Sequence, residues 1–196
     1  MVGMTKGDLP VHEAPLPPNA EQWNFSGGTW DGFIAMFTPA DSLLCTTFIG
    51  GSGQDKGLDV EADGQRILVA GSTSSGDMPL LDGGLQAWDA TQFGGMDVFI
   101  IEFNPNGDQR WGTYYGGSGF DMLGVHGMAL IDKGFVLVGE TQSPDLDIRG
   151  GSRWQDGTST APPNLNGFIA EFESDPRSLQ WSTFASGTGD SRLQPW

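Results

Sequence analysis

Five aspartates recur either after a glycine-rich stretch or at the start of an apolar segment, where their carboxylates could bind a cation or cap a turn. They are Asp31, Asp55, Asp97, Asp121 and Asp190. Carboxylate oxygens suit Ca²⁺, but a calcium loop alternates its acids at close spacing, and the nearest approach here is Asp145-Leu146-Asp147. We therefore predict no metal site and no cofactor, with calcium as the alternative. Each aspartate is expected to accept backbone N–H bonds within a turn.

The other reactive residue types form no catalytic constellation. His12 falls in an expected loop and His126 in an expected strand, without a Cys/His cluster of metal-ligand spacing. Cys45 takes the position that Trp111 and Trp181 take in equivalent segments, which favours a packed apolar group over a nucleophile. Because catalysis normally needs one asymmetric constellation and this sequence repeats its polar positions, we predict no catalytic residue.

One polar series would nevertheless suit an enzyme. Asp31, Asp97 and Asn166 begin equivalent apolar segments. Two carboxyl groups about 5–9 Å apart hydrolyse glycosidic bonds in many enzymes. An alternative function is therefore that of a carbohydrate-active enzyme, with its site where the equivalent segments meet.

Three tryptophans are candidate binding residues. Trp23, Trp88 and Trp154 fall between the apolar segments rather than within them. An indole ring offers a stacking surface for sugars or an anchor for a partner protein, and it also packs well against neighbouring loops. The sequence leaves both interpretations open, so these residues are predicted as a binding set for a protein or a glycan.

The composition narrows the classes of partner. Among 196 residues there are 25 acids and 9 bases, and the formal net charge of −16 makes a nucleic-acid partner unsuitable because phosphate contacts need clustered bases. The single cysteine forms no internal disulfide, and no apolar run reaches the length of a transmembrane helix. The 31 glycines and 12 prolines fit many short strands joined by turns.

A repeat organises the whole chain. Gly3, Gly71 and Gly139 are spaced by 68 residues, and a threonine follows each of them two positions later. A period of this size is typical of a chain built from copies of one supersecondary unit.

Each copy contains short apolar runs bounded by turn residues, which are typical of strands. The Asp63-Gly64 and Lys133-Gly134 steps each separate two such runs and predict hairpins. The expected strands are 31–37, 44–48, 58–62 and 67–70 in the first copy, 97–103, 111–115, 125–131 and 135–138 in the second, and 166–172 and 181–184 in the third. The last strand of each full copy is uniformly apolar, which predicts burial on both faces.

Four antiparallel strands per copy predict an all-β fold made of β-propeller blades, with about two and a half blades present. No segment has helical amphipathic periodicity. The expected organisation is 1–30 as the end of a preceding blade plus linker, 31–73 as a blade, 74–96 as a linker, 97–141 as a blade, 142–165 as a linker, 166–190 as the first half of a further blade, and 191–196 as a tail.

These residues resemble the SBBP family, bacterial repeats named for seven-bladed β-propellers. The family phrases correspond to residues 97–107, 113–119, 136–141 and 76–79, and the likeness extends from Val2 to Asp190. A departure is the family's usual lysine late in the first strand, which is Met36, Glu102 and Glu171 here. The resemblance implies a secreted, cell-surface or periplasmic module of bacteria, and it implies no shared enzymatic activity.

Two and a half blades do not close a ring, and an open array exposes strand edges. The chain is therefore expected to be part of a longer polypeptide, to assemble with copies of itself or other subunits, or to form a capped array. The expected function is a non-catalytic scaffold for protein–protein or cell-surface interactions. The alternative is a carbohydrate-active enzyme or a glycan-binding module, with its site in the propeller channel or on the linker aromatics.

Overall fold

The computed structural model describes residues 1–7, 9, 25–81, 89–150, 165–174 and 177–185 of the chain, and these residues form eleven strands and no helix. The predicted all-β class is confirmed. The strands are β1 (Val2–Thr5), β2 (Asp31–Phe37), β3 (Leu43–Ile49), β4 (Asp55–Ala62), β5 (Ile67–Thr73), β6 (Asp97–Phe103), β7 (Gln109–Tyr115), β8 (Asp121–Ile131), β9 (Gly134–Thr141), β10 (Asn166–Glu173) and β11 (Ser178–Ala185).

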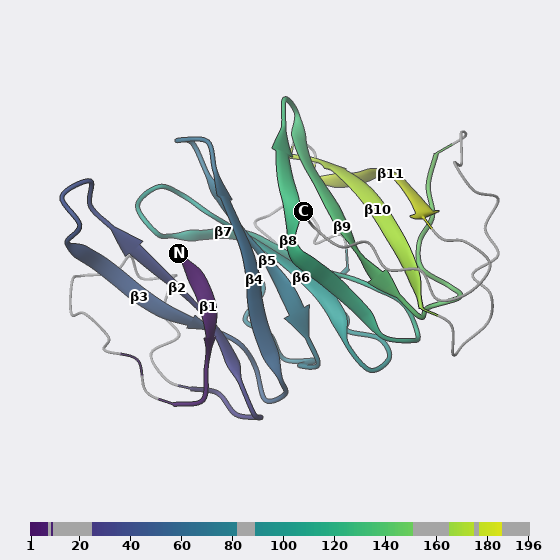
Figure 1. Ribbon diagram of the computed structural model, residues 1–196, viewed down its shortest axis with the longest axis horizontal. Helices are drawn as coiled ribbons and strands as arrows, with labels where there is room; N and C mark the ends of the chain where they lie inside the picture. Colours follow the sequence, from purple (N-terminus) through teal and green to yellow (C-terminus); the bar gives the residue numbers. More distant parts are fainter. Residues whose placement is uncertain (8, 10–24, 82–88, 151–164, 175–176, 186–196) are drawn as a thin grey trace.

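Three antiparallel sheets stand side by side along the long axis of the molecule (Figure 1). The first sheet contains β1, β2 and β3, the second contains β4 to β7, and the third contains β8 to β11. In each sheet, strands that follow one another in the chain are hydrogen-bonded neighbours. None of the three sheets is closed within the described residues.

The turn residues explain the predicted hairpins. The β4–β5 turn has Gly64 at a φ of 83°, a conformation that favours glycine. The Asp63 carboxylate accepts N–H bonds from Gln65 at 2.9 Å and from Arg66 at 3.1 Å, which fixes the turn. The β8–β9 hairpin forms at the second predicted position, with Ile131 opposite Gly134.

The repeated glycine has a packing role. Gly71 lies directly opposite Phe99 on the neighbouring strand, and a Cβ atom at Gly71 would lie 2.6 Å from the phenyl ring. The same pairing joins Gly3 to Phe33 and Gly139 to Phe168. Because each ring lies over the glycine backbone, any side chain there would collide with it. The 68-residue period therefore preserves one cross-strand contact in every sheet.

Alternate residues of the second sheet face two separate cores. Leu68 and Ile100 pack toward the third sheet, whereas Val69 and Ile101 pack toward the first. β5 is thus covered on both faces, as predicted. That prediction is wrong for β9, where every second residue of 136–140 is only partly buried. Within the described residues no further sheet covers that face.

The predicted grouping of strands into blades differs from the observed sheets. The strands expected at 31–73 divide between the first and second sheets, and those at 97–141 divide between the second and third. β1, expected to end a preceding blade, pairs with β2, and the strands within 166–190 complete the third sheet. The segments expected as inter-blade linkers instead join paired strands of one sheet. The tail at 191–196 lies outside the described residues.

The reason for the difference lies in the short connections. Residues 50–55 and 116–121, which we call the glycine turns, carry the chain from the last strand of one sheet to the first strand of the next. The strands flanking a glycine turn look like a hairpin in the sequence. In the fold they belong to neighbouring sheets. The aspartate that ends each glycine turn is hydrogen-bonded to residues at or just after the end of β5 or β9.

Candidate functional site

Three groups donate hydrogen bonds to the aspartate at the end of the first glycine turn, and a fourth bond ties the turn to one of them. The hydroxyl of Thr73 donates a hydrogen bond to Asp55, and the hydroxyl of Ser75 donates another at 2.8 Å. The Gly51 N–H donates to Asp55 Oδ2 at 2.8 Å, and the Gly53 N–H donates to Ser75 Oγ at 2.8 Å. The glycine turn is thereby fastened to the end of β5.

The second glycine turn repeats this arrangement. Ser143 Oγ donates to Asp121 Oδ2 at 2.6 Å, the Gly117 N–H donates to the same oxygen at 2.7 Å, and the Gly119 N–H donates to Ser143 Oγ at 2.9 Å. The capping interpretation is confirmed for Asp55 and Asp121. Asp190 lies outside the described residues.

A second aspartate accepts hydrogen bonds from the serine at the tip of each glycine turn. Asp77 Oδ1 accepts bonds from the N–H of Ser52 at 2.8 Å and from its hydroxyl at 3.1 Å. Asp145 Oδ1 binds Ser118 in the same way, with both distances at 2.9 Å. The backbone N–H bonds lower the pKa values of Asp77 and Asp145, which favours their charged forms.

A further buried acid faces each glycine turn from the neighbouring strand. A Cβ atom on Gly50 would lie 2.8 Å from Asp31 Cγ and 2.9 Å from Asp55 Oδ2, so the two carboxyl groups flank this glycine. At the next junction, Gly116 lies in the same way between Asp97 and Asp121. Burial raises the pKa of Asp31 to about 6 and that of Asp97 to about 7, an N–H bond to each lowers it, and the neighbouring acid raises it further.

The carboxyl groups at the two junctions are buried and only partly hydrogen-bonded. The Oδ1 atoms of Asp31, Asp97 and Asp121 are buried and accept no hydrogen bond within the described residues. Asn166, the third member of the predicted acid series, is also fully buried. In the described part of the chain, no group of three potential metal-ligating side chains gathers.

The remaining predicted residues are dispersed. Trp23, Trp88, Trp154 and His12 lie outside the described residues. His126 is exposed, with its Nδ1 3.9 Å from Asp59 Oδ1. Cys45 is buried, as expected for a packed apolar group, and burial raises the pKa of its thiol.

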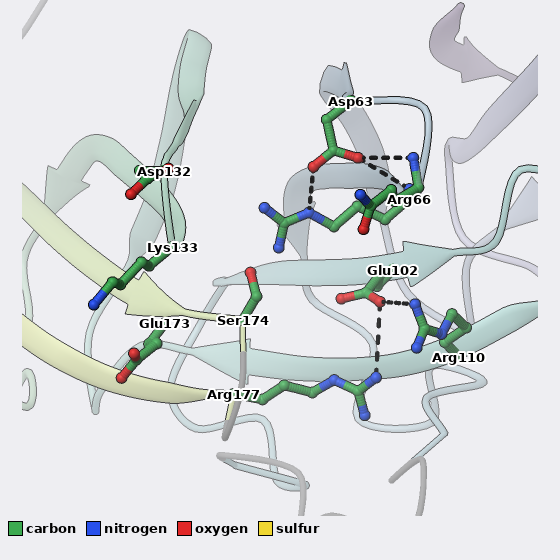
Figure 2. A pocket seen from close by; sticks show the side chains of 10 residues that line it. Asp63, Arg66, Glu102, Arg110, Asp132, Lys133, Glu173, Ser174 and Arg177 are labelled. Atoms are coloured by element: carbon green, nitrogen blue, oxygen red, sulfur yellow. Dashed lines mark hydrogen bonds and ion pairs between the residues drawn. The ribbon is translucent and has the colours of Figure 1, made fainter.

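A charged pocket with a volume of about 560 Å³ lies between the hairpin ends of the second and third sheets (Figure 2). Its bases come from the β4–β5 turn, β7, the β8–β9 turn and the β10–β11 turn. They are Arg66, Arg110, Lys133 and Arg177. Four of the nine bases of the chain therefore line one pocket. Its acids are Asp63, Glu102, Asp132 and Glu173.

Glu102 organises one side of the charged pocket. Only 3% of this residue is exposed, and its Oε1 lies 3.0 Å from an Arg110 nitrogen and 3.7 Å from an Arg177 nitrogen. The Arg177 guanidinium also lies 5.9 Å from the centre of the Trp111 ring. A buried carboxylate needs such partners, so this group fixes two guanidinium groups in place.

The conformation and surroundings of Arg177 are energetically unfavourable. Its φ of 58° is left-handed, an uncommon conformation for a residue with a side chain. Its Nε and the Ser174 Oγ are buried without a hydrogen-bond partner in the described structure. Strain and unsatisfied buried polar groups tend to gather at functional sites.

The sequence did not predict the charged pocket, because its bases are far apart in the chain. One signal was present in the sequence: Glu102 is the one charged residue within the apolar segment 98–103, and a buried carboxylate needs a cationic partner. The described residues include no helix that could cross a membrane. No protein-family model matches the chain, and a search of curated proteins finds no relative.

Proposed function

We propose that the chain is a non-catalytic β-propeller repeat scaffold of the SBBP type that it resembles. Its sheets continue into further sheets, supplied by other subunits or by the rest of a longer polypeptide, and the completed body mediates protein–protein or cell-surface contacts outside the cytoplasm of a bacterium. The observation that carries this proposal is the repetition of one junction between successive sheets, with the same register and the same bonded aspartate.

The edge of β1 supports the proposal. Its equivalents β5 and β9 are each paired on both sides, with β4 and β8 on the edge that corresponds to the outer edge of β1. Within the described residues, β1 pairs with β2 alone. An unpaired edge is a template for another strand, so the position that β4 and β8 occupy in the other sheets is available beside β1.

Met4 is the residue through which this edge can be tested. Met1 and Ala35 exchange both backbone hydrogen bonds, at 3.0 and 2.8 Å. Bonded and non-bonded pairs alternate in antiparallel sheets, so the N–H of Met4 points away from β2. Met4→Pro therefore removes an outward donor without breaking a bond to β2.

The test compares Met4→Pro with Met4→Ala in the native polypeptide. If the partner strand comes from another subunit, the native mass measured by light scattering falls only in the proline variant. If it comes from the same polypeptide, the proline variant unfolds at a lower temperature instead. Equal masses and equal unfolding temperatures for the two variants would contradict the proposal.

A further inference from the structure

The outer face of the third sheet repeats a face that the second sheet buries. We define the outer face by four partly buried residues of β9 and β10 that point away from the second sheet: Val136, Val138, Ile169 and Glu171. Their equivalents at the same register of β5 and β6 are Leu68, Ala70, Ile100 and Glu102. These equivalents are at most 3% exposed, because the third sheet packs over them. The outer face therefore has the register and composition of a surface that another sheet covers.

Glu102 shows what a glutamate needs at this position of a covered face. Its Oε1 lies 3.0 Å from an Arg110 nitrogen and 3.7 Å from an Arg177 nitrogen (Figure 2). Arg110 belongs to the same sheet as Glu102, whereas Arg177 comes from the β10–β11 turn of the covering sheet. One of the two cations is thus supplied across the interface between the sheets.

The position of Arg177 has an equivalent in each of the other two sheets. Asp41, Gly107 and Arg177 stand two residues before the residue that pairs with the last phenylalanine of the preceding strand, and their φ angles of 60°, 94° and 58° are all left-handed. A Cβ atom at Gly107 would lie 3.7 Å from the sulfur of Met36, which is the equivalent of Glu102 in the first sheet. At both interfaces, the left-handed turn residue of one sheet therefore lies next to the same position of the sheet before it.

Glu171 lacks both of the cations that Glu102 has. It makes no ion pair within the described residues, and Gln180 stands in the place of Arg110, one residue before the paired tryptophan. A carboxylate that is buried without a cation is strongly unfavourable. The sheet that covers Glu171 must therefore bring the cation. The first sheet of a second copy does not fit, because it would place Asp41 at this point and two carboxylates repel one another.

We propose that the outer face docks a further antiparallel sheet that carries a basic residue at the left-handed position of its hairpin turn, and that this base pairs with Glu171. Val136, Val138 and Ile169 supply the apolar contact, and Glu171 selects the partner by charge. This inference rests on the proposed scaffold function and adds the chemistry of the partner at this end of the array.

The test compares Glu171→Gln with the wild type and with Asp132→Asn in the native polypeptide and its assembly. Asp132 is an exposed acid of the β8–β9 turn that lines the charged pocket, so its substitution removes the same charge away from the outer face. If the covering sheet belongs to another subunit, Glu171→Gln should raise the dissociation constant at least about tenfold, since a hydrogen bond between charged groups is lost. If the sheet belongs to the same polypeptide, Glu171→Gln should lower the unfolding temperature instead. Asp132→Asn should match the wild type in both measurements.

The structure of the native assembly supplies the second readout. A basic nitrogen from a hairpin turn within about 4 Å of the Glu171 carboxylate would support the proposal. A sheet that covers the outer face without a base at this point would overturn it and leave the scaffold function standing. An outer face that remains in solvent would overturn both. Equal dissociation constants and equal unfolding temperatures for Glu171→Gln and the wild type would also overturn the ion pair.

Discussion

Replacing Asp97 by asparagine should remove a large part of the pH dependence of stability. Asp97 is 1% exposed, its Oδ2 accepts the Phe93 N–H at 2.8 Å, and its Oδ1 has no partner within the described residues. Burial raises its pKa from 3.8 to about 7. Asn166 stands at the equivalent position in the third sheet, so this fold already accepts an amide there.

The direction of the effect follows from proton binding. Between about pH 4 and pH 7 the folded protein keeps the Asp97 proton while the unfolded chain has lost it. The stability that this proton contributes is therefore fully present below pH 4 and is lost as the pH rises through 7. A pKa change from 3.8 to about 7 corresponds to about 4 kcal/mol in the free energy of unfolding.

The assay is urea unfolding of the wild type and Asp97→Asn at pH 5 and pH 8, at one ionic strength. The wild type should lose more stability than the variant across this interval. The loss that remains in the variant reports Asp31, whose pKa is raised to about 6, and the overall negative charge. Glu140→Gln, on the outer face of β9, is the control. Equal pH dependence in wild type and Asp97→Asn would show that the Asp97 carboxyl does not bind a proton on folding in this pH range.

Two further substitutions test the packing. Gly71→Ala places a methyl group against the Phe99 ring and the Lys56 carbonyl, so the unfolding free energy measured in urea should fall by about 3 kcal/mol or more, whereas Gly76→Ala, with open space around it, should have little effect. Glu102→Gln leaves two guanidinium groups of the charged pocket without their carboxylate and should cost about 3 kcal/mol. Unchanged thermal unfolding of the Glu102 variant would show that this group does not hold the pocket together.

The strands were predictable because local chemistry determines them. Short apolar runs bounded by turn residues and the Asp63-Gly64 turn act over short distances, and the 68-residue period repeats them. The grouping of strands into sheets was not predictable, because it depends on which neighbouring strand each strand forms hydrogen bonds with. The glycine turns resemble hairpins in the sequence, and only the bonds from Thr73 and Ser75 to Asp55 reveal that they link separate sheets.

The candidate sites differ in the same way. The capping role of Asp55 and Asp121 was expected, because a turn aspartate meets donors close to it in the chain. The charged pocket combines Arg66, Lys133 and Arg177 from three separate turns, and their spacing in the sequence carries no common signal. Their proximity arises only when the second and third sheets pack.

The measurement that most directly tests the scaffold claim is the structure of the native assembly at the edge of β1. We predict a strand paired antiparallel with β1 and an aspartate opposite Thr5, as Asp55 lies opposite Thr73 and Asp121 opposite Thr141. A native assembly in which the outer edge of β1 faces solvent would contradict it.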